Sequence, residues 1–211
     1  MTMMKRIMLL TLLAVVAGLA QTVNCLVAVV NGEIITLLDV EVAAEFGLGR
    51  EVAVEAGRDP RLAALEVLID RRVVLDLARE ARGIDREELA AALADLRRGL
   101  GEDAFAAKLG KFGLAEKDLE PYLRDGLLYD RALALRFSAT IPVSLTEVER
   151  HYRDIYVPEQ TRLGNAAEPL ERAADRIESL LREERRTKQT ADWVRDLRKR
   201  ADIQLKKDCL K

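Results

Sequence analysis

The chain has 211 residues, of which 49% are hydrophobic, 33% charged and only 4% aromatic. This length fits one compact domain, or one domain with a small appendage, and the many charged and few aromatic residues favour a mainly α-helical protein. Lysine and arginine number 34 against 36 aspartate and glutamate, a net charge of −2. That balance argues against a nucleic acid as the main partner.

Residues 1–20 have the layout of a secretory signal peptide. Lys5 and Arg6 precede an apolar run, and Gly18-Leu19-Ala20 forms a small-x-small cleavage site. The apolar run is shorter than the roughly 20 residues that span a bilayer, which favours cleavage after Ala20 over retention as a membrane anchor. We therefore expect an exported mature chain.

The first mature segment predicts a β-hairpin. Leu26–Val30 has strand composition, Asn31-Gly32 is a two-residue turn that takes positive φ, and Glu33–Ile35 returns as a second strand. A lone hairpin is marginally stable in water, so we expect a partner strand. Asp202–Lys206 alternates polar and apolar residues, as a half-buried strand does. The sequence thus predicts a small antiparallel sheet that joins the two ends of the chain.

The two cysteines, Cys25 and Cys209, flank these terminal strands. Export to an oxidising compartment favours a disulfide between them, with two unpaired terminal cysteines as the alternative. A disulfide that closes nearly the whole chain contributes on the order of 5 kcal/mol in the chain-entropy model.

Between the hairpin and the last strand, apolar residues recur at the helical period. The predicted helices cover residues 36–46, 60–81, 85–99, 102–109, 116–137, 144–156 and 170–201. Asp59 before Pro60 marks a helix start, and Asp85 with Glu88 marks another. The helix 60–81 carries the widest apolar stripe, so we expect it to be the central core helix.

Two segments interrupt this helical pattern. Residues 48–59 are interpreted as a loop, and residues 157–169, with two prolines, a glycine and no periodicity, as a linker. The expected organisation is a signal peptide over 1–20, a helical region over 21–156, the linker over 157–169, and a long helix and strand over 170–211 that complete the same core.

Five segments, in this order after the signal peptide, resemble the SurA-like periplasmic chaperones and foldases. They are VAVVNGEIITLLDVE, LEVLIDRRVVLDLAREARGI, DLEPYLRDGLLYDRALALRF, IPVSLTEVERHYRD and RIESLLREERRTKQTADWVRDLRKRADIQL. In that family the N-terminal and C-terminal segments form one helical chaperone core that binds unfolded polypeptides, often outer-membrane proteins. Most members carry parvulin-type isomerase domains between the two segments. Here the corresponding place holds only the linker, so the resemblance implies a periplasmic chaperone core without isomerase activity.

Residue chemistry does not point to catalysis. General acid–base and nucleophilic catalysis need converging groups, whereas the sole histidine, His151, lies between Arg150 and Tyr152 on a predicted helix. The chain has no cysteine or histidine pair at metal-ligand spacing. We expect no catalytic residues, metal, cofactor or small-molecule substrate, and the sequence carries no signal for oligomeric state.

A chaperone for extended clients needs an exposed apolar surface. The candidate residues lie in a glycine-punctuated region and are Leu100, Phe105, Leu109, Phe112, Leu114 and Tyr122. The alternative is that they pack under the helix 116–137. The expected function is a holdase for exported or outer-membrane polypeptides. A dedicated envelope assembly subunit with the same fold and a peptidyl-prolyl isomerase are the alternatives.

Overall fold

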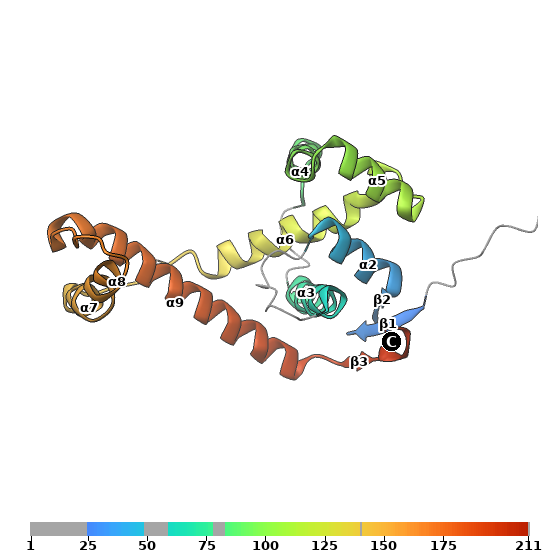
Figure 1. Cartoon of the computed structure of the whole chain (residues 1–211). Coiled ribbons are helices and arrows are strands. Elements are labelled where there is room, and N and C mark those ends of the chain that lie inside the picture. The colour runs from blue at the N-terminus through green and yellow to red at the C-terminus, as the bar shows by residue number, and fades with distance from the viewer. Residues whose placement is uncertain (1–24, 49–58, 78–82, 140, 211) are drawn as a thin grey trace, which may run out of the picture.

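The computed structural model describes residues 25–48, 59–77, 83–139 and 141–210. This part of the chain is mainly α-helical, with one small antiparallel sheet (Figure 1), as the sequence predicts. The predicted signal peptide and its cleavage site, most of the predicted loop 48–59 and the last residues of the predicted helix 60–81 lie outside the described residues.

The described residues up to Leu119 form two strands and five helical segments. They are β1 Leu26–Val30, β2 Glu33–Thr36, α2 Leu37–Phe46, α3 Pro60–Leu77, α4 Arg86–Leu100, α5 Glu102–Phe112 and the 3₁₀ turn η2 Glu116–Leu119. The second half follows with α6 Glu120–Arg136, α7 Leu145–His151, the π-helical turn η3 Tyr152–Tyr156, α8 Val157–Arg162, α9 Leu170–Arg200, β3 Ile203–Leu205 and the 3₁₀ turn η4 Lys207–Leu210.

The sheet has the strand order β2-β1-β3, with both pairings antiparallel. Asn31 (φ 49°) and Gly32 (φ 86°) make the hairpin turn in the left-handed conformation that their sequence predicts. Val29 pairs with Ile34 of β2 on one side and with Gln204 of β3 on the other. The predicted partner strand for the hairpin is therefore confirmed.

Further bonds tie the first and last described segments to each other and to the neighbouring helices. Cys25 and Cys209 form a disulfide with Cα atoms 6.2 Å apart. The Cys25 carbonyl also accepts the N–H of Leu37 at 2.7 Å, which ties β1 to the start of α2. Leu210, at the end of η4, is buried, and its carbonyl accepts a hydrogen bond from Arg61 of α3 at 3.3 Å.

Local capping rules set several helix ends as expected. The Thr36 hydroxyl accepts the N–H of Asp39 at 3.3 Å, and the Asp39 carboxylate accepts the N–H of Thr36 at 2.8 Å, a reciprocal capping box. Gly47 ends α2 with φ 63°. Asp85 and Glu88 form a second capping box at the start of α4.

The predicted end of one helix and the predicted start of the next are wrong. The short helix α5 does not stop at Leu109, because Gly110 keeps helical geometry and Gly113, with φ 65°, is the residue that ends it. The predicted helix 116–137 begins as the 3₁₀ turn η2, and α6 starts only at Glu120, where Pro121 fits a first turn without its N–H.

The segment 157–169 is also more ordered than its sequence suggests. The helix that begins after Ser144 does not end at Tyr156 but continues through η3 into α8, so the first six residues of the expected linker are helical. Pro158 lies in the first turn of α8, directly after the wider π turn in which the Val157 N–H bonds the Tyr152 carbonyl. A proline lacks an N–H and crowds the preceding turn, and the π turn widens the helix at this point.

Two apolar clusters hold the described elements together. The larger one lies among the sheet, α2 to α6 and the second half of α9, and it is built around fully buried residues such as Phe46, Leu65 and Ile69. This confirms α3 as a core helix. The smaller one, around Val148 and Ile177, joins α7 to the first half of α9. The long helix α9 therefore belongs to both clusters.

Candidate functional site

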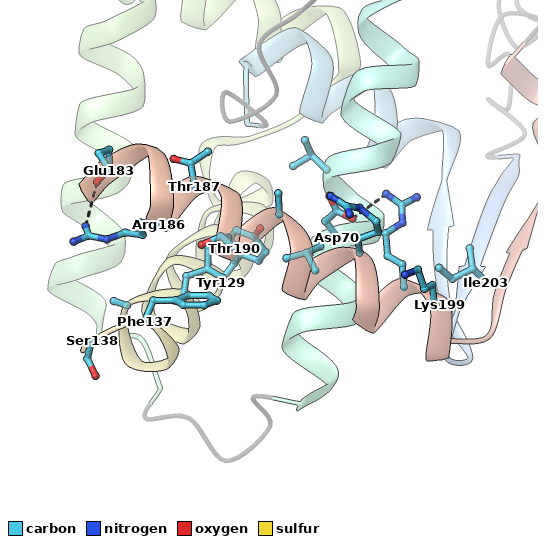
Figure 2. Close-up of a pocket in the computed structure, with 17 residues that line it drawn as sticks. Asp70, Tyr129, Phe137, Ser138, Glu183, Arg186, Thr187, Thr190, Lys199 and Ile203 are labelled. Atoms are coloured by element: carbon cyan, nitrogen blue, oxygen red, sulfur yellow. Dashed lines mark hydrogen bonds and ion pairs between the residues drawn. The ribbon is translucent and has the colours of Figure 1, made fainter. Parts of the chain in front are cut away.

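A cleft of about 1250 Å³ lies along α9, between this helix and α6 and α3, and reaches β3 at one end (Figure 2). One face of α9 forms its longest wall, with Thr187, Ala191, Val194 and Arg198 spaced three or four residues apart. From Glu183 to Lys199 the helix rises roughly 24 Å at about 1.5 Å per residue. The cleft is therefore elongated along α9.

Apolar and aromatic side chains form the floor of the cleft. Val67 of α3, Tyr129 of α6 and Val194 of α9 line it and are each less than a tenth exposed. Leu133 and Phe137 continue the α6 side at intervals of four residues from Tyr129 and are half-buried. The floor thus offers apolar surface to whatever enters the cleft.

Charged side chains at the rim are paired along α9 itself. Arg186 lies 3.3 Å from Glu183, and Arg195 lies 2.8 Å from Asp192, both as partners three residues apart on the helix surface. Exposed pairs of this kind contribute about 0–1 kcal/mol each. These arginines can therefore exchange their present partner for another group at low energetic cost.

A more enclosed ion pair fixes the wall between α9 and α3. Arg198 reaches across to Glu66 at 2.6 Å and to Asp70 at 2.9 Å. Burial raises the pKa of Asp70 above its ordinary value, and the Arg198 guanidinium acts against that shift. Because one guanidinium bonds two carboxylates of α3, we assign this cluster a structural role in joining α9 to α3 at the cleft wall.

Aromatic contacts hold the opposite end of the cleft. The ring of Phe137, just past the end of α6, meets the ring of Trp193 of α9 edge-on, with centroids 5.7 Å apart. The Arg136 guanidinium lies 5.5 Å from the Phe137 ring centroid and 5.9 Å from that of Trp193. These contacts place Phe137 at the cleft wall.

The residues that the sequence suggested as an exposed apolar surface lie elsewhere. Phe105 is 2% exposed, with its ring edge-on to Phe46 of α2 at a centroid distance of 6.0 Å, so it is a core residue. The remaining candidates are half-buried against the same cluster and are Leu100, Leu109, Phe112, Leu114 and Tyr122. The Tyr122 hydroxyl donates to the Asp39 carboxylate at 2.7 Å. The structure favours the packing alternative, although Phe105 packs against α2 and not under α6.

Sequence reasoning missed the cleft, although one signal for it was present. Tyr129, Leu133 and Phe137 follow each other at intervals of four residues along α6. The polar run 182–190 of α9 has the composition of a solvent-facing segment. Part of it, including Thr187 and Thr190, lines the cleft instead.

Other kinds of site find little support in the described residues. His151 is half-buried at the end of α7 and is not among the residues that line the cleft. Within the ranges that the structure covers, no group of three or more histidine, cysteine, aspartate or glutamate side chains is arranged to hold a metal ion. None of the described helices is both long and apolar enough to cross a membrane.

A scan of the chain against models of known protein families found no match, and a search of curated proteins found none either. Function is therefore inferred from the residues and the geometry of this chain.

Proposed function

We propose that the protein is a periplasmic holdase-type chaperone that binds unfolded or extended segments of exported polypeptides, including outer-membrane proteins, in the cleft along α9. The observation that carries this proposal is the cleft itself, which joins an apolar and aromatic floor to a rim of loosely paired charges. The signal-peptide layout of residues 1–20 supports the location, and the resemblance of five segments to SurA-like proteins supports the class.

The length of the cleft suits a polypeptide segment. An extended chain advances about 3.3 Å per residue, so roughly 24 Å of cleft accommodates about seven client residues. Tyr129, Leu133 and Phe137 would contact the apolar side chains of such a segment. Burial of apolar surface is non-directional, which gives affinity without demanding one client sequence.

The rim suits the polar parts of the same segment. Thr187 and Thr190 line the cleft, and their hydroxyls would bond client main-chain groups. Arg186 and Arg195 are held by exposed pairs, and their aliphatic stems can follow clients of different shape. Binding of this kind is reversible and needs no nucleotide. The proposal includes no prolyl isomerase activity.

A pair of substitutions on α9 tests the cleft. Ala191 is exposed and lines the cleft, while Gln189 is exposed on the same helix and is not among the lining residues. Ala191→Glu and Gln189→Glu each add one negative charge. Glutamate is a good helix former, so neither substitution should change the melting temperature much. The assay is light scattering after a urea-unfolded outer-membrane protein is diluted into buffer.

The wild type and Gln189→Glu should suppress aggregation equally, and Ala191→Glu should need a several-fold higher concentration for the same effect. Full activity of Ala191→Glu would remove the cleft as the site. A wild type that protects none of several unrelated unfolded proteins, yet co-purifies with one stoichiometric partner, would support a dedicated assembly subunit instead. Catalysis of prolyl isomerisation in a peptide assay would support an isomerase.

A further inference from the structure

β3 is an outer strand of the sheet, paired with β1 along one side. The main-chain bonds on that side are made by alternate residues. The Asp202 carbonyl accepts from the Asn31 N–H at 2.8 Å, and the Lys206 N–H donates to the Val27 carbonyl at 2.7 Å. Gln204, midway between Asp202 and Lys206, faces β1 in the same register.

The alternation leaves the other edge of β3 unpaired. In an antiparallel ladder, residues between the hydrogen-bonded positions direct their N–H and C=O groups to the opposite side. Those residues are Ile203 and Leu205. Within the part of the chain that the structure describes, no hydrogen bond outside the ladder reaches these groups. The N–H and C=O groups of Ile203 and Leu205 thus offer two donors and two acceptors to an added strand.

This edge continues into the cleft. Ile203 lines the cleft at the end where Lys199 lies (Figure 2). Ile203 is paired with Val30 and Leu205 with Ala28, so both lie on the sheet face that carries the buried Val30 and Ala28. A strand added beside β3 would send every second side chain to that same face, where the cleft floor begins.

We propose that β3 is a docking edge for client backbone: an extended client segment adds to the sheet beside Ile203 and Leu205, and its alternate side chains enter the cleft. This inference rests on the proposed chaperone function and specifies the substrate class, which is chain in β conformation with free main-chain N–H groups. Main-chain pairing supplies affinity that does not depend on client sequence, while the floor selects apolar side chains at alternate positions.

A second copy of the protein fits this edge less well than a client does. Pairing of β3 with β3 would use a strand of three residues on each side. So short a ladder buries far less surface than the roughly 1,200 Å² of a standard stable interface, and it would leave the apolar floor of both clefts uncovered.

Two peptides test the edge on the intact protein. The first is a fluorescein-labelled peptide of about seven residues with alternating apolar and polar side chains, matched to the length of the cleft. The second has the same side chains but carries N-methyl groups on alternate amides, so it cannot donate to the edge. By fluorescence anisotropy the first should bind about tenfold more tightly, the effect expected of one or two main-chain hydrogen bonds.

A proline at the edge tests the same bonds from the protein side. The Leu205 N–H points away from β1, so Leu205→Pro removes an outward donor and spares the ladder, a placement that edge strands tolerate. This variant should bind the first peptide about tenfold more weakly and the methylated one as before, because it loses one main-chain partner. Leu205→Val changes the side chain but keeps the N–H, so it should retain the preference for the first peptide over the methylated one.

Equal affinity of the wild type for the two peptides would overturn the inference, and so would the absence of binding to either peptide. Both outcomes are measured on the wild type, so they do not depend on whether Leu205→Pro folds. Loss of a wild-type dimer in Leu205→Pro by sedimentation, with peptide affinity unchanged, would assign the edge to self-association and also overturn it. The chaperone function is judged separately, by the response of aggregation suppression to Ala191→Glu. It stands if that response is seen while the two peptides bind equally.

Discussion

Truncation of Phe105 to alanine should strongly destabilise the protein, although Phe105 lies on a short helix between glycines. Its side chain is 2% exposed, its ring packs edge-on against Phe46 at 6.0 Å, and the Arg97 guanidinium lies 5.3 Å from its ring centroid. Phe46 is itself fully buried, so the core has little freedom to collapse into the space that alanine leaves.

The expected loss is about 4 kcal/mol in the free energy of unfolding, within the roughly 3–5 kcal/mol typical of a buried phenylalanine changed to alanine. About 0.5–1.5 kcal/mol of that loss belongs to the edge-on aromatic pair with Phe46. Because whole domains are stable by only about 5–15 kcal/mol, the variant should unfold at a much lower urea concentration than the wild type.

Urea unfolding can be followed by the fluorescence of Trp193, the only tryptophan of the chain. Phe112→Ala is the matched control, since Phe112 lies on the same helix but is only half-buried, and it should cost clearly less. A loss below about 1 kcal/mol for Phe105→Ala would refute the reasoning, because so small a cost belongs to a surface position. Phe105 would then again be a candidate residue of the exposed client-binding surface that the sequence suggested.

Two further predictions concern the chain ends and the contact between α2 and α5. Cys25→Ser with Cys209→Ser should lower the free energy of unfolding by about 5 kcal/mol in the chain-entropy model, given a sequence separation of 184, and urea unfolding that shows less than about 1 kcal/mol would contradict it. Hydrogen bonds from Lys108 and Lys111 lower the pKa of Glu45 to about 2 from 4.5. Because protonation then favours the unfolded state, this contribution is complete above pH 4.5 and is lost as the pH falls toward 2. Glu45→Gln should flatten that part of the stability profile, and an unchanged acid slope would count against it.

Local chemistry explains which parts of the fold the sequence predicts. Asn31 and Gly32 specify a hairpin turn by their tolerance of positive φ. Thr36 with Asp39 specifies a helix start through bonds between residues three apart. The alternating pattern around Gln204 marks a strand, which the structure has at Ile203–Leu205. Each of these signals lies within a few residues, and the structure confirms each of them.

The cleft could not be predicted in the same way, because it depends on how distant elements meet. The polar run around Thr187 has the same composition whether its helix faces bulk solvent or a cleft. Periodicity places Phe105 on an apolar face but cannot say whether another helix covers that face, and α2 does so here. Pro158 predicts the end of a helix. The residues around it carry no sequence signal for the π turn that lets the helix continue.

The pairing of β1 with β3 also constrains the order in which the molecule can fold. β1 is among the first described residues and β3 among the last, so their pairing joins segments that lie far apart in the sequence. Helices built from neighbouring residues form early, whereas pairing between distant segments is slow and must wait for the whole chain. Until β3 arrives, the main-chain groups of β1 that later bond β3 stay unpaired along an open edge. During its own maturation the protein therefore displays the kind of nascent apolar strand that we propose it later binds in others.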